Sequence, residues 1–344
     1  MKKHDRCIVI GASAGGVETL REVVAGLPAD LRVPVFVVLH IPPYAASILP
    51  KILAKACPLP VIHAKDGERV SGGTVYVASP DHHLLIEGGR VAVKRGPKEN
   101  RFRPSIDALF RSAAHVYGPG AVGVVLSGAL DDGTSGLWSI QRTGGTVVIQ
   151  QPGDARFDSM PRSALEYVVP DHLLPAAEMG PLLGRLALEP VPAAPPMDPH
   201  FEKLLAAEVK IAAEGGAFQK GIMELGTLTP FTCPECHGAL ARILNGLTLR
   251  FRCHTGHAYT DSALLEGVME CAGEMLWQVI RTLEESVMLL NNMGTHLREA
   301  GDMGRAEAFF TKARILEKRS RAFHDAALDH ESLSGDNLGQ KPEN

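Results

Sequence analysis

The sequence predicts an α/β protein built on a doubly wound, mostly parallel, Rossmann-like sheet, followed by a small ribbon domain and an α-helical hairpin. Strand and helix patterns alternate along the amino-terminal half, which is typical of a parallel sheet with helices on both faces. A short segment after residue 230 gathers cysteine and histidine, and the region beyond it repeats apolar residues every three or four positions. These three observations predict the order of the domains.

Composition limits the classes of function. A chain of 344 residues is too long for one ordinary core, so we expect two domains or one domain with an extension. The net charge of −4 gives no overall electrostatic reason to expect nucleic acid or an anionic membrane as a partner. The first residues lead into a strand without the apolar stretch of a signal peptide, and no apolar run reaches the ~18 residues of a membrane span. We therefore expect a cytoplasmic protein without direct membrane insertion.

The elements of the amino-terminal half follow from these alternating patterns. The first strand begins at Cys7 and breaks into a turn of small residues around Ser13. Three later segments, over 74–78, 84–86 and 91–93, look like short antiparallel strands with a glycine hairpin. The other predicted elements are a helix over 17–27, a strand over 33–39, a helix over 47–56, a helix from Ser105, a strand over 121–126, a helix through Trp138 and Ile140, and a strand over 146–149.

The turn around Ser13 has functional and structural interpretations. Its spacing, Gly11-x-x-x-Gly15-Gly16, differs from the G-x-G-x-x-G of dinucleotide-binding turns, and the next strand ends in His40 where a ribose-binding carboxylate would be expected. The same turn does match G-x-S-x-G, in which a strained turn exposes a serine nucleophile. The structural alternative is a glycine-rich turn that contains an incidental serine.

Further polar groups directly follow apolar strands. His40 ends one strand and the pair Asp131-Asp132 follows another, so a parallel sheet brings them to the edge that carries Ser13. A serine nucleophile, an imidazole base and an orienting carboxylate are the groups that acyl transfer requires. The backbone N–H of Ala14 is a candidate donor to an oxyanion. The residues alone do not choose between the two aspartates, and the chain order differs from the Ser, Asp, His order of α/β-hydrolases.

Several ordered motifs resemble the protein-glutamate methylesterases of bacterial chemotaxis, the CheB-type catalytic domain, over residues 6–186. These motifs are IGASAGG at 10–16, LHIP at 39–42, RPSIDALF at 103–110, LSGALDDG at 126–133 and MPRSA at 160–164. The resemblance implies the methylesterase fold over residues 1–188 and hydrolysis of glutamate γ-methyl esters on chemoreceptors or related signalling proteins. It also implies glutamine deamidation as a second activity, and no cofactor for catalysis.

The resemblance assigns roles to individual residues. It implies Ser13 as nucleophile, His40 as base and Asp132 as the acid, with the backbone N–H of Ala129 joining Ala14 in an oxyanion hole. The loop departs from the family's usual Thr-Gly-Met-Gly-x-Asp-Gly and carries Asp131 as an extra carboxylate, which we expect to be solvated.

The regulation of this protein can differ from that of many family members, and its function has an alternative interpretation. Many family members carry an amino-terminal receiver domain, whereas this chain starts at the catalytic strand, so we expect a solo form without phosphorylation control in cis. The alternative to an esterase is a catalytically idle binding or scaffold module in a bacterial signalling complex, which recognises its partner through its tail.

A proline-rich linker is predicted over 189–199, and a helix plus a zinc ribbon over 200–260, with ribbon strands over 240–243 and 247–251. Cys233 and Cys236 form a C-x-x-C knuckle that can close a tetrahedral zinc site with Cys253 and one histidine. Similar tails on solo methylesterase-like proteins keep C-x-x-G-H, which implies His257 as the fourth ligand, with His254 as the alternative. Four protein ligands leave no open position, so the zinc is expected to be structural.

The segment over 261–330 is predicted to be a helical hairpin that turns at 301–304, and residues 331–344 are predicted to be disordered. The first helix carries an apolar seam with alternating spacings of four and three. The seam comprises Leu265, Met269, Ala272, Leu276, Val279, Leu283, Leu290, Met293 and Leu297. An intramolecular hairpin would bury this seam, and so would a homo-oligomer formed through the same helices.

Overall fold

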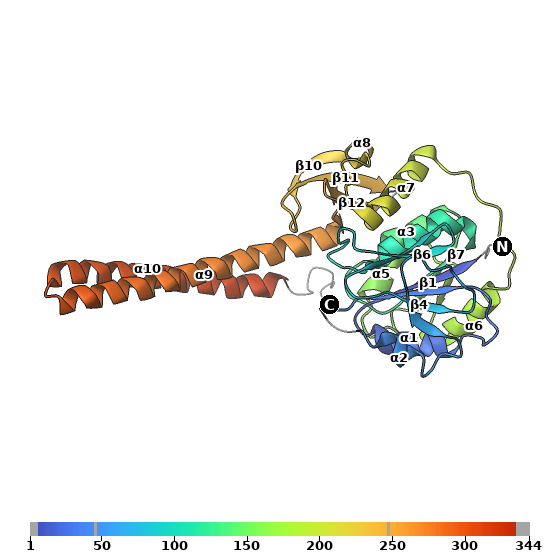
Figure 1. The fold of residues 1–344 in the computed structure, drawn as a ribbon, viewed down its shortest axis with the longest axis horizontal. Coiled ribbons are helices and arrows are strands. Elements are labelled where there is room, and N and C mark those ends of the chain that lie inside the picture. Colours follow the sequence, from blue (N-terminus) through green and yellow to red (C-terminus); the bar gives the residue numbers. More distant parts are fainter. Residues whose placement is uncertain (1–5, 45–46, 246–247, 335–344) are drawn as a thin grey trace, which may run out of the picture. The chain divides into compact units, whose positions relative to one another are not determined.

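The computed structural model describes residues 6–44, 47–245 and 248–334 (Figure 1). The contacts divide the chain into two compact units, Met1–Leu264 and Leu265–Asn344. Among the described residues, no helix is both long enough and apolar enough to cross a membrane.

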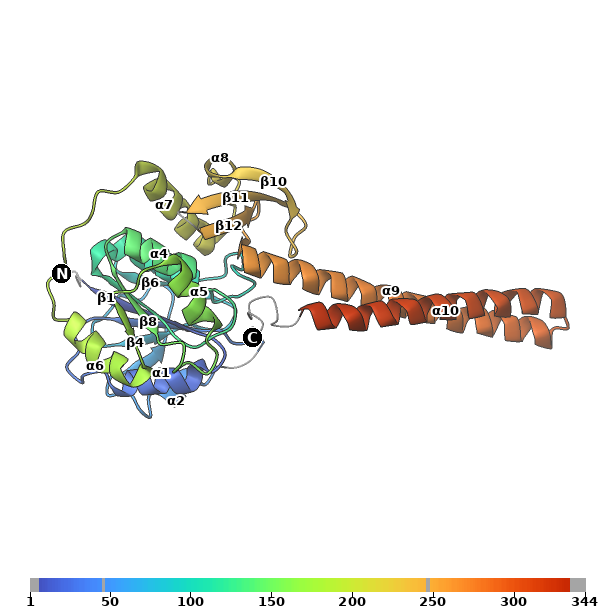
Figure 2. The same ribbon diagram turned by 180° about the vertical axis from the view of Figure 1, so that it is seen from behind.

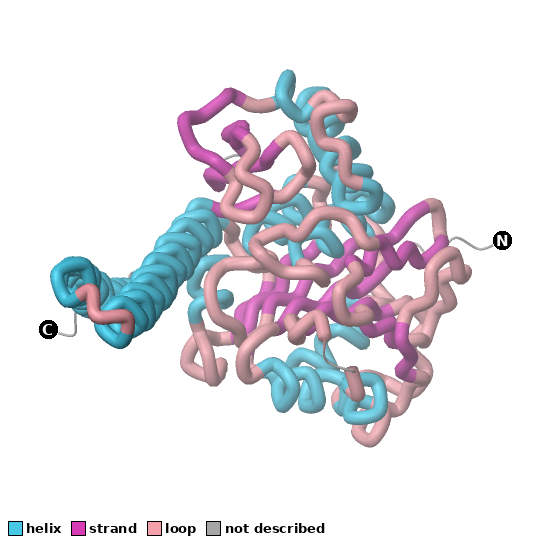
Figure 3. The backbone as a smooth tube through the Cα atoms, turned by 60° about the vertical axis from the view of Figure 1, so that its left-hand side comes forward, coloured by secondary structure: helices cyan, strands magenta, loops and turns pink. Residues whose placement is uncertain are grey.

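A parallel sheet forms the centre of the first unit (Figure 3). Within the described residues it has seven strands in the order β3-β4-β2-β1-β7-β8-β9, and every neighbouring pair is parallel. Because the chain passes from β1 to β2 on one side and to β7 on the other, the strand order reverses beside β1. Ligands of such sheets bind outside the carboxyl ends of the strands at this point. The strands are β1 (Cys7–Ala12), β2 (Val35–Leu39), β3 (Val61–His63), β4 (Val75–Val77), β7 (Ala121–Val125), β8 (Thr146–Gln150) and β9 (His172–Leu174).

Helices cover both faces of this sheet (Figures 1 and 2). One face packs against α1 (Gly16–Ala25), α2 (Leu49–Leu53) and α6 (Ala176–Leu186). The other face packs against α3 (Ile106–Tyr117), α4 (Thr134–Arg142) and α5 (Ser159–Tyr167). Alternate residues of β1 enter the two cores, Val9 on one side and Ile10 on the other. The predicted doubly wound α/β fold is therefore confirmed.

Some predicted elements differ from the structure. The segment over 74–78, predicted as an antiparallel strand, contains β4, which lies parallel between β2 and β3. Its three residues are all buried, as expected for a strand covered on both faces. The antiparallel hairpin consists of β5 (His83–Glu87) and β6 (Arg90–Lys94). The strands β3 and β9 and the helices α5 and α6 were not predicted, and three-residue strands are too short to reveal a period.

The ribbon is an antiparallel sheet that follows α7 (Pro199–Glu214) and α8 (Ile222–Leu225). In the part of the chain that the structure describes, its strands are β10 (Thr227–Thr232), β11 (Ala239–Asn245), β12 (Thr248–Cys253) and β13 (Ala258–Thr260). The predicted helix and the two predicted strands are present, with one further strand on each side, and position 247 of the second predicted strand lies outside the described residues. The ribbon belongs to the same compact unit as the parallel sheet, and the domain boundary at 189–199 stays a prediction.

A buried ionic cluster joins the ribbon to the rest of the first unit. Arg250 of β12 pairs with Glu208 of α7 at 2.7 Å, and Arg252 pairs with Glu208 at 3.1 Å and with Glu99 at 2.8 Å. Arg111 of α3 also pairs with Glu99. Burial alone would raise the pKa of Glu208, but the three arginines outweigh it and lower that pKa. Removing one partner of such a buried ion pair leaves an uncompensated charge away from water, which strongly destabilises the fold.

Two long helices, α9 (Asp261–Glu299) and α10 (Met303–Ser334), form a hairpin, and the second unit begins at Leu265 within α9. Contacts between them run antiparallel. His330 Nε2 lies 2.7 Å from the carbonyl oxygen of Met269, and the Trp277 and His324 rings are 5.3 Å apart further along the pair. Helix α10 continues four residues past the predicted end of the hairpin, and the remaining residues of the predicted disordered tail, 335–344, lie outside the described part.

The predicted apolar seam of α9 only partly matches the contact between the helices. Ile280 is buried, whereas the seam residues Leu265, Val279 and Met293 are exposed. The seam was predicted from apolar side chains, with no glycine among them. The structure also uses a glycine, because the Phe310 ring lies so close to Gly294 that an added Cβ would be 2.7 Å from it.

Candidate active site

Ser13 lies in the turn between β1 and α1. Its N–H donates to the carbonyl oxygen of Ser127, and its own carbonyl oxygen accepts from the N–H of Gly16, both at 2.9 Å. Gly15 has a φ of +70°, and a Cβ at that position would lie 2.9 Å from Ser127 Oγ, so the turn requires glycine there. The serine is thereby held at the carboxyl edge of the sheet, at the switch point.

His40 follows β2 and lies between Ser13 and Asp132. Its Nδ1 is 3.2 Å from Ser13 Oγ, and its Nε2 is 2.8 Å from Asp132 Oδ2. An ionised carboxylate can only accept, so Nε2 carries the proton and Nδ1 is left to accept the serine hydroxyl proton. Phe102 stacks on the imidazole, with centroids 3.8 Å apart and planes at 8°. The structure thus brings the three predicted residues together.

The carboxylate of Asp132, from the loop before α4, packs against the N-terminus of α3. Unpaired backbone N–H groups there favour a negative charge. Burial alone would raise the pKa of Asp132, but its hydrogen bonds outweigh that effect and lower the pKa, so the carboxylate stays ionised. Besides His40, its oxygens accept from the N–H groups of Ile106 (2.7 Å) and Asp107 (3.1 Å), the Ser105 hydroxyl (3.0 Å) and Asn100 Nδ2 (2.8 Å).

The prediction that Asp131 is solvated is wrong. Its side chain is buried, with the residue only 8 % exposed, and its Oδ1 accepts a hydrogen bond of 2.8 Å from Thr260 Oγ1 at the end of β13. Burial raises the pKa of Asp131 to about 6. The ribbon covers this carboxylate, and no sequence pattern links two residues so far apart along the chain.

The loop after β7 packs against Ser13. A Cβ at Gly128 would lie 2.8 Å from Ser13 Cβ, so only glycine allows the loop to approach so closely. The Ser127 hydroxyl donates to the carbonyl oxygen of Ala14 at 2.8 Å and ties this loop to the serine turn. Among the described residues, the backbone N–H of neither Ala14 nor Ala129 donates to a protein acceptor. These are the two N–H groups predicted for an oxyanion hole.

A cavity of about 340 Å³ opens over Ser13 and His40. Its lining includes Lys98, Arg103 and Asp81, and Arg103 donates from Nε to Asp81 Oδ1 at 2.9 Å. Arg101 also lines the cavity, and Lys98 is paired with Glu235, so these three cations exceed the two carboxylates by one charge.

Three residues that were not predicted from the sequence also border this site, namely Lys98, Asn100 and Phe102. They directly precede the RPSIDALF motif. That proximity to a predicted helix start was the one available signal.

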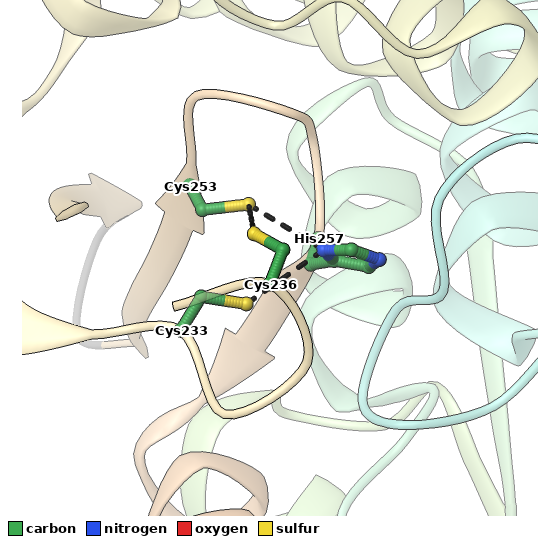
Figure 4. Close-up of side chains that lie close together, drawn as sticks. All are labelled: Cys233, Cys236, Cys253 and His257. Carbon is green, nitrogen blue, oxygen red and sulfur yellow. Dashed lines mark hydrogen bonds between the residues drawn. The ribbon is translucent and has the colours of Figure 1, made fainter. Parts of the chain in front are cut away.

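The predicted zinc ligands come together at one end of the ribbon (Figure 4). The ligand atoms of Cys233, Cys236, Cys253 and His257 all lie within 4.8 Å of one another. The Sγ atoms of Cys236 and Cys253 are 3.6 Å apart, and His257 Nδ1 is 3.7 Å from Cys233 Sγ and 3.6 Å from Cys253 Sγ. A tetrahedral zinc with bonds of about 2.3 Å to sulfur and about 2.0 Å to nitrogen separates its ligands by roughly 3.5–3.8 Å, so this donor set fits zinc.

His254, the alternative fourth ligand, lies outside this cluster. Its side chain is exposed and its ring packs over Gly238, where an added Cβ would be 2.2 Å away. The Tyr259 hydroxyl lies 3.2 Å from Cys233 Sγ, the position of a hydrogen bond that supports a thiolate ligand.

Comparison with known proteins adds three findings. Residues 8–183 match the family described as CheB methylesterase. A Leptospira interrogans protein, provisionally named protein-glutamate methylesterase/protein-glutamine glutaminase, is 39% identical over 180 residues, which are 52% of this chain and 93% of that protein. An Anaeromyxobacter dehalogenans protein named protein-glutamate methylesterase/protein-glutamine glutaminase 5 is 39% identical over 190 residues, 54% of this chain and 52% of that protein.

A solved structure is similar as well. The crystal structure of the Thermotoga maritima CheB methylesterase catalytic domain has a TM-score of 0.51 and 34% identity, and the match covers 53% of this chain and 98% of that one. The family match ends at residue 183, so the ribbon and the hairpin lie outside it.

Proposed function

The chain belongs to the CheB methylesterase family, and on that premise we propose that it is a serine esterase that hydrolyses glutamate γ-methyl esters of a chemoreceptor or related signalling protein. One observation carries the proposal. The hydrogen-bonded series from Asp132 through His40 to Ser13 has distances of 2.8 and 3.2 Å and ends in the cavity.

The geometry supports a two-step acyl transfer. Ser13 Oγ attacks the ester carbonyl carbon while His40 Nδ1 takes the hydroxyl proton, and Asp132 stabilises the imidazolium through Nε2. The negative oxygen of the tetrahedral intermediate accepts from the N–H groups of Ala14 and Ala129. His40 then returns the proton to the leaving methoxide, and methanol departs.

Water completes the cycle. It attacks the glutamyl ester on Ser13 with His40 as base, and the products are the glutamate carboxylate and free serine. The same steps would release ammonia from a glutamine side chain, which is the proposed second activity. No step uses a cofactor.

Zinc has a structural role in this proposal. Cys233, Cys236, Cys253 and His257 would hold it with four protein ligands and no open position, so it would stabilise the ribbon and take no part in hydrolysis. A ribbon with so small a core of its own gains folding free energy from such a metal.

The proposed partner is a methylated chemoreceptor or another signalling protein in the cytoplasm. The excess of positive charge around the cavity, three cations against two carboxylates, suits a peptide whose neighbouring glutamates are ionised. A homo-oligomer through α9 and α10 is part of the proposal, because Met275, Met288, Leu289 and Ile315 are exposed on that hairpin.

A fluorophosphonate probe distinguishes an esterase from an idle scaffold. It reacts only with a serine that a base activates, so we expect one adduct per chain, located on Ser13 by mass spectrometry and absent from Ser13→Ala. A wild-type protein without an adduct at Ser13 would favour the scaffold.

A further inference from the structure

We propose that the ribbon is a positioning element of the active site: β13 holds the segment 98–103 in the conformation that Asp132 and His40 need. This inference rests on the proposed esterase function. It assigns a catalytic purpose to a part of the chain that lies outside the family match.

The segment pairs with the ribbon through its backbone. Ala258 N–H donates to the carbonyl oxygen of Lys98 at 3.2 Å, and Asn100 N–H donates to the carbonyl oxygen of Ala258 at 2.8 Å. Glu99 and Ala258 form the corresponding parallel bridge. The segment therefore continues the ribbon sheet beyond β13. Two residues further on, Phe102 stacks on His40.

Asn100 connects the ribbon directly to the catalytic acid. Its Oδ1 accepts from the N–H of Thr260 at 3.0 Å, while its Nδ2 donates to Asp132 Oδ1 at 2.8 Å and to Asp107 Oδ2 at 3.0 Å. The backbone donor on Thr260 fixes the orientation of the amide, because a flipped amide would face N–H with NH₂ and a carboxylate with oxygen. The side chain is buried and its φ is +49°, so the ribbon supports a backbone conformation that non-glycine residues rarely adopt.

Thr260 also contacts the loop after β7, which carries Asp131 and Asp132. Its hydroxyl donates to Asp131 Oδ1 at 2.8 Å and accepts from the N–H of Ala263 at 3.1 Å in the first turn of α9. One ribbon residue thus contacts Asp131 directly and Asp132 through Asn100. The carboxylate at position 131 has no part in the triad, and its contact with Thr260 accounts for its presence in the loop.

Ion pairs extend the connection to the proposed zinc site. Arg252, next to the ligand Cys253, pairs with Glu99 at 2.8 Å, and Glu235, inside the C-x-x-C knuckle, pairs with Lys98 at 2.8 Å. Lys98 lines the cavity over Ser13. Loss of zinc would loosen the ribbon, and the segment 98–103 would lose the pairings that order it.

The first test removes the metal from the full chain by Cys236→Ser. Zinc content is measured directly, trypsin cleavage after Lys98 and Arg101 is compared with cleavage after the exposed Lys55, and the rate of fluorophosphonate labelling of Ser13 is followed. We expect zinc loss, faster cleavage at the first two sites relative to Lys55, and labelling slower by about tenfold to a hundredfold, because small displacements of catalytic groups have effects of that order. A zinc-free variant with wild-type cleavage and labelling would overturn the proposal.

The second test leaves the metal ligands intact. Thr260→Val removes the hydroxyl and keeps the branched shape, Thr260→Ser restores the hydroxyl, and Thr229→Val removes a ribbon hydroxyl that donates to the Leu240 carbonyl oxygen within the ribbon. We expect Thr260→Val to lower the maximal labelling rate several-fold with an unchanged concentration dependence and unchanged zinc content. Thr260→Ser and Thr229→Val should label like the wild type.

The outcomes separate the two proposals. If the wild-type Ser13 is not labelled, the esterase function fails. If the wild type is labelled and Thr260→Val matches its maximal rate, the positioning role fails even where Cys236→Ser does not fold.

Discussion

His40 Nε2 lies 2.8 Å from Asp132 Oδ2, while the adjacent Asp131 turns its carboxylate to Thr260. Two neighbouring acids therefore have different partners, His40 for Asp132 and the ribbon residue Thr260 for Asp131.

The first prediction compares these two carboxylates. Asp132→Asn should reduce turnover by on the order of 10³- to 10⁴-fold, because an amide can hold the wrong imidazole tautomer. Asp131→Asn should reduce it only slightly, since its amide oxygen still accepts from Thr260. Ester hydrolysis rates are compared with circular dichroism as the folding control. The reverse ranking would assign the acid to Asp131.

The second prediction concerns pH and stability. Burial raises the pKa of Asp131 to about 6 in the folded protein, and the neighbouring charges of Asp132 and Asp261 act in the same direction. An unfolded aspartate has a pKa of about 3.9. The stabilising contribution of the protonated group is therefore fully present below pH ~4 and is lost as the pH rises through 6. The free energy of unfolding of Asp131→Asn, measured relative to wild type, should rise by about 2 kcal/mol between pH 4 and pH 8.

Urea titrations at both pH values measure this difference. A constant difference would mean that Asp131 has an ordinary pKa in the folded protein.

The third prediction concerns the buried ionic cluster. Arg252→Met removes one of the positive charges that neutralise the buried Glu99 and Glu208 carboxylates. The free energy of unfolding should therefore fall by about 3–5 kcal/mol. Arg242→Met, on the exposed side of β11, serves as the matched control and should change stability by about 0.5 kcal/mol or less. Equal urea midpoints for the two variants would contradict a structural role for the cluster.

The fourth prediction concerns the metal. Protein purified without chelator should contain one zinc per chain, and His257→Ala should lose it because Nδ1 is part of the four-atom cluster. His254→Ala should retain zinc, since that ring packs on Gly238 outside the cluster. Elemental analysis of the three proteins decides the assignment. Zinc retained by His257→Ala and lost by His254→Ala would exchange the two histidines.

The sequence was sufficient to predict the parallel sheet and to place the serine, histidine and aspartate at one edge. Ser13 and His40 directly follow β1 and β2, Asp132 lies in the loop that follows β7, and the carboxyl ends of parallel strands share an edge. Local patterns therefore contained that information. The three cysteines were similarly predictable, because ligand spacing within a ribbon is local. The choice of His257 over His254 came from the resemblance to other tails and not from spacing.

The contacts that surround the proposed triad could not be predicted in this way. Thr260 contacts Asp131 and Asn100, which precede it in the chain by 129 and 160 positions, and no periodicity encodes such a pairing. For the same reason Asp131 was predicted to be solvated, whereas the ribbon covers it. Asn100 and Phe102 lie in a loop, so neither strand nor helix patterns drew attention to them.

The central claim is that Ser13 hydrolyses glutamate γ-methyl esters. The most direct measurement is the release of labelled methanol from receptors methylated in the same cell, with the wild-type chain and with Ser13→Ala. We predict steady release by the wild type and none above background by the variant, with both proteins folded. Equal release by the two proteins would contradict the account.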